Sequence, residues 1–143
     1  MSDIRVPVLI VGGGASGLTT SIFLSAYGID HLLVERHEST SILPKAHYLN
    51  QRTMEILRQY GVADDIYDVG APMQNMGKVV WRTTLAGDGP LDAKTFYKMD
   101  AFGGGGLAER YERDSACPST NYPQLRLEPL LRRHAEQRAP GKV

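Results

Sequence analysis

The chain has 143 residues, which is enough for one ordinary domain, and 42% of them are hydrophobic, so a core of moderate size can form. Sixteen basic and sixteen acidic residues give a formal net charge of zero, which argues against a nucleic-acid-binding protein because such proteins are usually clearly basic. Cys117 is the only cysteine and the longest apolar run, Val6–Val11, is far too short to cross a bilayer, so we expect a cytoplasmic protein without a membrane partner.

The first elements of the chain are predicted to be a strand, a helix and a second strand. Val6–Val11 is an apolar run rich in β-branched residues, typical of a parallel strand that is buried on both faces. Ala15–Tyr27 carries a helical pattern, and Gly28 stands where a C-cap belongs. The run HLLVE, His31–Glu35, predicts a second strand that ends in a carboxylate. This order of elements is that of a βαβ unit.

The glycine cluster GGGASG, residues 12–17, lies between the first strand and the helix and fits the pattern G-x-G-x-x-G. In that pattern Gly12 permits the tight turn, Gly14 lets the backbone approach a pyrophosphate, and Gly17 allows close packing of helix and strands. The helix N-terminus then offers N–H groups and a positive dipole end to the phosphates. Glu35 can accept hydrogen bonds from ribose hydroxyls, which disfavours NADP. A glycine cluster can also be a plain turn, but the whole order favours a dinucleotide, with FAD and NAD both open.

Two later stretches resemble the class A flavoprotein aromatic hydroxylases, in particular their phenol and chlorophenol monooxygenase branch. They are LPKAHYLNQRTMEILRQYGVADDIYDVGAP, residues 43–72, and GGGLAERYERDSACPSTNYPQLRLEPLLRRHAEQ, residues 104–137. The resemblance extends over essentially the whole chain. It implies that the glycine motif binds FAD, in an α/β, Rossmann-like FAD/NAD(P)-binding fold that is incomplete and carries a β-hairpin insertion.

The resemblance also implies contacts to FAD, residue by residue. The pyrophosphate would meet the glycine motif and the first turn of the helix, at Gly12, Gly14, Ala15, Ser16 and Gly17. Glu35 would hold the adenosine ribose, with Arg36 beside the adenine. Lys45 stands where the family usually has an arginine near the pyrophosphate and flavin. Gln124 matches a glutamine on the flavin side, and Arg126 is a second candidate there.

Several of these positions have an ordinary structural alternative. Lys45 keeps the positive charge but loses the bidentate fork of arginine, and it could equally be a solvated lysine. Gln124 could cap the helix that follows it. A lone histidine such as His47 is expected to be structural or exposed rather than catalytic. Cys117 precedes a proline and has no evident base partner, so we interpret it as a loop cysteine.

The middle of the chain predicts a helix and then a hairpin. Asn50–Tyr60 has a helical pattern, with Asn50 as a possible N-cap and Gly61 as a natural stop. The stretches Val79–Leu85 and Lys94–Asp100 are strand-like, and AGDGPLDA between them has turn chemistry. We therefore expect a β-hairpin inserted into the nucleotide-binding domain.

The last third of the chain predicts a loop and a helix. Four glycines, Gly103–Gly106, are interpreted as a mobile loop, although the residues LAERYERD after them could form a short helix. Leu127–Arg138 predicts a helix whose buried side carries Leu127, Leu130 and Leu131. Lys142 and Val143 could begin a further strand.

The resemblance sets the expected function. In the family, an Asp-Gly segment, a Gly-Asp-Ala segment and a substrate domain come later in the chain, and neither a Gly-Asp-Ala segment nor a substrate domain is in the sequence. Residues 1–143 are therefore expected to be the N-terminal part of an FAD-binding domain. Alone they are expected to be inactive, to bind FAD weakly or not at all, and to aggregate or pack loosely. The whole enzyme would hydroxylate a phenolic compound, with NADPH reducing FAD and O₂ supplying the oxygen atom. No metal site and no particular catalytic residue are predicted, and the oligomeric state stays open. The alternatives are a non-catalytic nucleotide-binding remnant and an NAD-dependent dehydrogenase. Residues 43–72 argue against the dehydrogenase.

Overall fold

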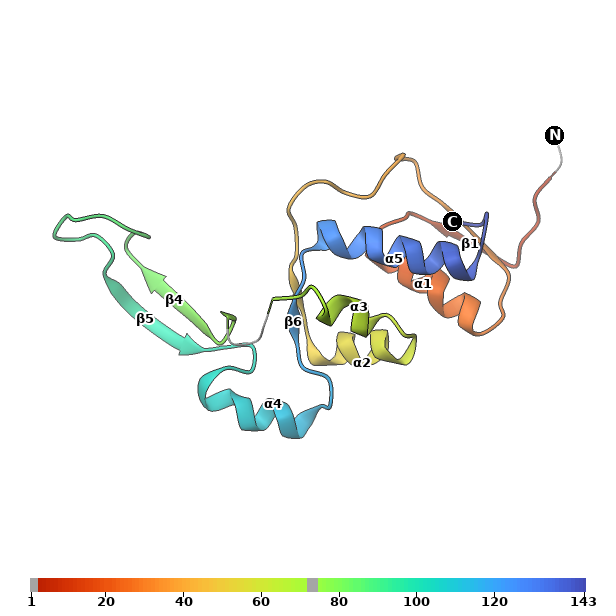
Figure 1. The fold of residues 1–143 in the computed structure, drawn as a ribbon. Helices are drawn as coiled ribbons and strands as arrows, with labels where there is room; N and C mark the ends of the chain where they lie inside the picture. The colour runs from red at the N-terminus through yellow and green to blue at the C-terminus, as the bar shows by residue number, and fades with distance from the viewer. Residues whose placement is uncertain (1–2, 72–74) are drawn as a thin grey trace.

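The computed structural model describes residues 3–71 and 75–143, and its largest part is a body of helices packed on short strands (Figure 1). The resemblance stretch at residues 43–72 ends just outside the first described range. The elements in chain order are β1 (Val8–Val11), α1 (Ala15–Ala26), β2 (His31–Val34), β3 (Tyr48–Leu49), α2 (Gln51–Gln59), α3 (Ala63–Tyr67), β4 (Lys78–Arg82), β5 (Thr95–Asp100), the 3₁₀ turn η2 (Gly105–Leu107), α4 (Ala108–Asp114), β6 (Thr120–Asn121) and α5 (Gln124–Arg138). None of the helices described is both long and apolar enough to span a membrane.

The predicted βαβ unit is confirmed. β1 and β2 pair in parallel, from Val8 opposite His31 to Val11 opposite Val34, and α1 connects them. β1 begins two residues later than expected, after Pro7, since proline has no N–H to donate to a ladder. On the other edge of β2, the Leu33 N–H donates to the Lys142 carbonyl at 2.7 Å. The chain after α5 therefore returns along β2, as expected for the start of a further strand.

The glycine cluster makes a tight connection that two of its residues explain. Gly12 has a φ of +112°, a backbone conformation that L side chains rarely adopt. A Cβ placed on Gly17 would lie 2.0 Å from the Gly12 carbonyl oxygen, so the first turn of α1 can approach the end of β1 only without a side chain there. The N–H of Gly12 donates to the Val34 carbonyl at 2.8 Å, which ties the connection to β2.

The core lies between the β1–β2 pair and the helices, with α5 lying across α1 (Figure 1). Its buried members come from every part of the body and include Ile10, Leu18, Ile22, Leu33, Met54, Leu57, Ile66, Leu127, Leu130, Leu131 and Ala135. The three leucines predicted for the buried side of α5 are thus confirmed.

One buried polar side chain, His31, is fully paired within the core. Its Nδ1 lies 3.0 Å from the Ile29 carbonyl oxygen, and its Nε2 lies 2.7 Å from the Ser21 hydroxyl. Because a carbonyl can only accept, the His31 Nδ1 is the donor to Ile29. Through its two ring nitrogens, His31 joins β2 to α1.

The expectation that the first strand is buried on both faces is wrong. Ile10 is 9% exposed, but Leu9 is 56% and Val11 80% exposed, and Val34 of β2 is 41% exposed. The helices cover only the face of the β1–β2 pair on which Ile10 lies. The residues of the first strand that point the other way therefore form an apolar surface.

We predict that this surface promotes self-association. Threonine is β-branched and suits a strand, so replacing both Leu9 and Val11 by threonine should make the surface polar without disturbing β1. The monomer fraction in size-exclusion chromatography should then rise while thermal unfolding changes little. Ile10→Thr is the matched control. It places a hydroxyl in the core and should lower the free energy of unfolding by about 1–3 kcal/mol. Equal effects of both changes on unfolding would contradict this assignment of the two faces.

The other predicted elements are largely confirmed, with two corrections. The Asn50 side chain caps α2 by accepting from the Thr53 N–H at 2.8 Å, and β4 and β5 form the expected antiparallel hairpin. α5 begins at Gln124, three residues before the predicted start, because Pro123 is its N-cap and a proline φ suits a helix start. The glycine run is not wholly a loop, because η2 leads directly into α4.

Figure 1 shows that the hairpin projects away from the helical body, with α4 near its base. The Asp100 carboxylate at the end of β5 accepts from the Gly106 N–H at 2.8 Å. This bond joins the hairpin to η2 and gives the second half of the glycine run a fixed turn.

Candidate cofactor site

Two short strands that the sequence did not predict shape the site. β3 and β6 pair antiparallel, with Tyr48 opposite Asn121. The pairing continues towards the glycine cluster, because the Tyr122 N–H donates to the His47 carbonyl at 2.7 Å and the Gln124 N–H donates to the Ala46 carbonyl at 2.8 Å. Residues far apart in sequence, at positions 45 and 124, are thereby brought to one place at the start of α5.

The main cavity lies between the glycine cluster and this strand pair and has a volume of about 620 Å³. Its lining comes from the end of β1, the first turn of α1, residues 45–49 and the start of α5. The lining residues are Val11, Gly12, Gly14, Ala15, Ser16, Gly17, Lys45, Ala46, His47, Tyr48, Leu49, Tyr122, Gln124, Leu127 and Glu128.

Two further cavities continue around the glycine cluster. The middle cavity, of about 400 Å³, shares Gly14, Lys45 and Glu128 with the main one and extends along residues 39–43 to Glu35. The end cavity, of about 240 Å³, shares Glu35 with the middle one and extends to Leu33, Arg132 and Val143. We call these three cavities, which share lining residues, the glycine-loop groove.

The N-terminus of α1 gives the main cavity a positive character. Gly14 is the N-cap, no side chain caps the helix, and its first turn contains no acidic residue. The first N–H groups of the helix and the positive end of its dipole therefore lie at the cavity wall. Lys45 lines the same cavity and can add a point charge. Such a wall suits an anionic group, above all a phosphate.

Glu35 ties the end of the second strand to the glycine cluster. Its Oε2 accepts from the Gly13 N–H at 2.7 Å, and its Oε1 accepts from the His37 N–H at 2.9 Å and lies 2.8 Å from the His37 Nδ1. The bond from Gly13, followed by those from His37, lowers the pKa of this carboxyl from 4.5 to about 2. Glu35 therefore stays ionised and keeps its oxygens as acceptors at any ordinary pH.

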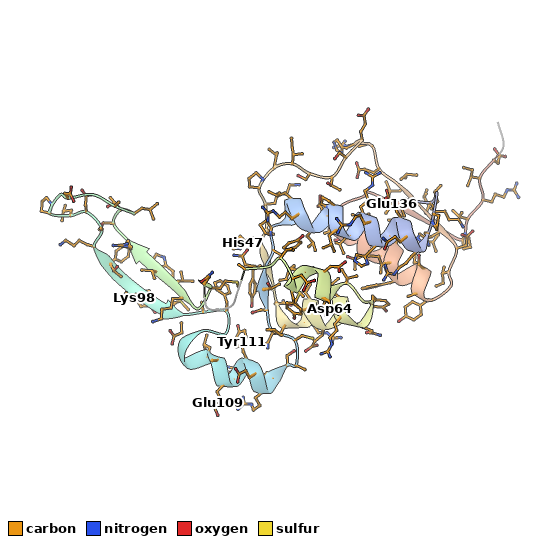
Figure 2. The ribbon with its side chains drawn as sticks, in the orientation of Figure 1. His47, Asp64, Lys98, Glu109, Tyr111 and Glu136 are labelled. Carbon is orange, nitrogen blue, oxygen red and sulfur yellow. The ribbon has the colours of Figure 1, made fainter. Side chains whose placement is uncertain are left out.

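The lowered pKa predicts a specific acid sensitivity. The folded state favours the ionised carboxylate, so the stability that Glu35 adds is complete above pH 4.5 and is lost as the pH falls towards about 2. In Glu35→Gln we expect thermal unfolding to depend less on pH within that window than in the unchanged chain. Glu109→Gln, on the outer side of α4 (Figure 2), is the control and should leave the pH dependence as it is. Identical pH profiles for Glu35→Gln and the unchanged chain would exclude this role.

Eight of the ten residues proposed from the sequence line the glycine-loop groove. They are Gly12, Gly14, Ala15, Ser16, Gly17, Glu35, Lys45 and Gln124. Arg36 and Arg126 are exposed and are not among the described residues that line these three cavities. Contact of any of the ten with a cofactor remains a prediction.

The structure also places His47 and Cys117, for which the sequence predicted no catalytic role. His47 is exposed beside β3, at the end of the body nearest the hairpin (Figure 2), and it borders the main cavity. Cys117 lies in the loop between α4 and β6, as expected, and is buried. Its Sγ accepts from the Arg58 guanidinium at 3.7 Å.

Sequence reasoning missed Glu128, which is only 3% exposed and borders both the main and the middle cavity. Its Oε1 accepts from the Gln124 amide Nε2 at 2.7 Å. The Gln124 side chain thus bonds one turn along α5 and does not cap the helix. The signal was present in the sequence, because Glu128 lies among the leucines of the buried helix face and four residues after a candidate cofactor contact.

These features define a domain built to hold a nucleotide cofactor, and comparison with known proteins gives its class. A family model described as "FAD binding domain" matches residues 5–143. The chain therefore belongs to the FAD-binding domain family, and FAD, rather than NAD, is the cofactor of that family. The resemblance to flavoprotein hydroxylases is confirmed.

Relatives with specific names narrow this class further. Aklavinone 12-hydroxylase from Streptomyces peucetius subsp. caesius is 42% identical over 134 residues, which are 91% of this chain and 26% of the relative. Phenol 2-monooxygenase from Pseudomonas sp. (strain EST1001) is 33% identical over 138 residues, 94% of this chain and 21% of the relative. The crystal structure of the flavin-dependent monooxygenase PieE in complex with FAD and substrate matches with a TM-score of 0.89 and 42% identity, covering 97% of this chain and 23% of that one. The chain thus spans about a fifth to a quarter of the length of these proteins.

Proposed function

We propose that this chain holds the FAD of a flavin-dependent aromatic hydroxylase in the glycine-loop groove. The observation that carries the proposal is the convergence of β1, α1, residues 35–47 and the start of α5 on one groove. The glycine motif between β1 and α1 would act as the G-x-G-x-x-G of a Rossmann-like fold, with the pyrophosphate at the helix N-terminus.

The groove fits FAD in size and in chemistry. A main cavity of about 620 Å³ that continues into two smaller ones suits a long, two-part ligand. A Cβ placed on Gly14 would have only the Glu128 Oε1 within 4 Å, at 3.6 Å, so the missing side chain leaves the helix mouth open to a phosphate. The uncapped N–H groups of α1 then have an acceptor to bind.

Each end of the groove suits one end of the cofactor. Glu35, ionised and at the border between the middle and end cavities, has acceptor capacity left for ribose hydroxyls. The end cavity beyond it, with Leu33 and Val143, would take the adenine, near the exposed Arg36. Lys45 would lie beside the pyrophosphate, and Gln124 would face the flavin side. Arg126 would act there only after its exposed side chain turns inwards.

The names of the relatives support a proposal for the reaction of the whole protein. Their names include aromatic hydroxylases that act on phenol, on 2,4-dichlorophenol and on aklavinone. We therefore propose hydroxylation of a phenolic ring with NADPH as reductant and O₂ as oxygen source. Bound FAD supplies the redox chemistry, and the residues described above bind, orient and shield it. From the sequence, residues 1–143 alone are expected to bind FAD weakly or not at all. Because the described residues already form the glycine-loop groove, we propose instead that they bind FAD without hydroxylating a phenol.

The test is an FAD titration of the purified chain. We expect saturable quenching of flavin fluorescence and a thermal midpoint that rises with FAD concentration, as linkage requires for a ligand of the folded state. NAD at the same concentrations should leave the midpoint unchanged, and NADPH oxidation should not respond to added phenol. An unchanged midpoint with FAD in large excess, together with unquenched fluorescence, would overturn the proposal.

A further inference from the structure

Glu128 is an unusual carboxylate, because it is buried without a cationic partner. It is 3% exposed, and the described residues contain no Lys, Arg or His within ion-pair distance of it. A buried charge is costly unless hydrogen bonds replace its water. Two donors do so: the Gln124 Nε2 at 2.7 Å from Oε1 and the Ser41 N–H at 3.1 Å from Oε2. Retaining such a group calls for an explanation beyond the packing of α5.

The carboxylate joins three separate segments around the glycine-loop groove. It belongs to α5, it holds the backbone of residues 39–43 through Ser41, and its Oε1 is the atom nearest to the open side of Gly14. Because it borders both the main and the middle cavity, it stands at the junction between them. A shift of this group would move Ser41 and Gln124 together.

The hydrogen bond to Gln124 also determines which way its amide faces. The Gln124 Nε2 is the donor in this bond, so the NH₂ group points to Glu128 and the amide oxygen points elsewhere. Gln124 lines the main cavity. The orientation therefore makes its oxygen, an acceptor, the amide atom that is available to a ligand in that cavity.

We propose that Glu128 is a positioning residue for the cofactor. Its Oε1 accepts from the Gln124 amide and so orients it, which leaves the amide oxygen to accept from an N–H or O–H group of the flavin half. Its Oε2 anchors residues 39–43 as the wall of the groove. This inference rests on the proposed FAD site. It assigns no contact between Glu128 and the cofactor itself.

Glu128→Gln tests the orientation directly. The new amide has one acceptor oxygen, which the Ser41 N–H can keep, and an NH₂ group that donates. Gln124 then either loses the bond or turns its amide so that its oxygen accepts from residue 128. In the turned orientation, the NH₂ group of Gln124 faces the cavity. In ¹⁵N-labelled protein without FAD, we expect the Gln124 side-chain amide signals to move, whereas Glu109→Gln, the matched control on α4, should leave them in place.

A double-mutant cycle separates orientation from general destabilisation. Glu128→Gln should weaken FAD binding about tenfold when Gln124 is present, which corresponds to a coupling of ordinary size for contacting groups. In a Gln124→Ala background the same change should weaken binding by less than about threefold. A purely structural role of Glu128 would give equal losses in both backgrounds.

The outcomes distinguish this inference from the proposed function. If the unchanged chain fails to bind FAD, the proposed function fails, and the Gln124 amide signals still decide the role of Glu128. Unmoved amide signals in Glu128→Gln, or equal losses in the two backgrounds, overturn the inference. If Glu128→Gln does not fold, Glu128→Asp keeps the charge but is too short to hold both donors, and it should show the same pattern in weaker form.

Discussion

Gly17→Ala is expected to destroy the native packing of the βαβ unit. The added Cβ would lie 2.0 Å from the Gly12 carbonyl oxygen and 3.2 Å from the Gly12 carbonyl carbon. Neither residue can shift easily to relieve the clash. The Gly12 N–H is hydrogen-bonded to the Val34 carbonyl at 2.8 Å, and α1 is packed into the core through Leu18 and Ile22. Overpacking by side chains typically costs about 1–3 kcal/mol, and a clash with backbone should exceed that range.

A loss above about 4 kcal/mol is exceptional for one substitution and removes most of the stability of a domain at the low end of the usual range of about 5–15 kcal/mol. We therefore expect Gly17→Ala to lose its cooperative thermal transition, followed by circular dichroism. Gly14→Ala is the matched control, because its Cβ meets no backbone atom within 4 Å and its φ is −76°. A Gly17→Ala protein that unfolds at the midpoint of this control would mean that α1 does not approach β1 as closely as described.

The sequence predicted the parts of the fold that local chemistry determines. The glycine spacing, the Asn50 cap and the turn residues between β4 and β5 each act within a few residues of themselves, and each predicted its element correctly. The start of α5 was missed because Pro123 is a helix starter only when the chain before it arrives in an extended form, here through β6.

The features that complete the site depend on distant contacts and could not be predicted. β3 and β6 have two residues each, far too few for a periodic pattern, and they form only because they pair with each other. Without that pairing, Lys45 and Gln124 have no reason to share a cavity. The leucines around Glu128 indicate a buried face of α5, but the bond from the Ser41 N–H to Glu128 depends on the return of residues 39–43 over the helix and could not be predicted.

The first strand shows a case in which a local pattern predicted the element correctly but its burial wrongly. A continuous apolar run predicts that a strand needs cover on both faces, but it does not say which segments supply the cover. In the described chain α1 and α5 cover one face, and Leu9 and Val11 stay exposed on the other. The pattern therefore gave the correct strand and pairing and the wrong burial.

Gly14→Val is expected to abolish FAD binding while the fold survives. Gly14 has φ −76° and ψ −177°, an extended conformation that β-branched residues adopt freely, so valine introduces no backbone strain. Only the Glu128 Oε1, at 3.6 Å, lies within 4 Å of the new Cβ, and the rest of the side chain projects into the main and middle cavities. The free energy of unfolding without ligand should therefore change by no more than it does for surface substitutions, about 0.5 kcal/mol.

The same side chain occupies the approach of a pyrophosphate to the N-terminus of α1. Each methyl group there displaces a phosphate oxygen from the uncapped N–H groups, so the FAD dissociation constant should rise at least about a hundredfold, or about 2.8 kcal/mol. Gly14→Ala should give a smaller rise, since it adds a single carbon. Fluorescence titration of the three proteins, with unfolding of each measured without FAD, makes the comparison. Retention of FAD affinity in a folded Gly14→Val protein would place the phosphates away from the glycine cluster, whereas graded losses at constant stability would locate them at the mouth of this helix.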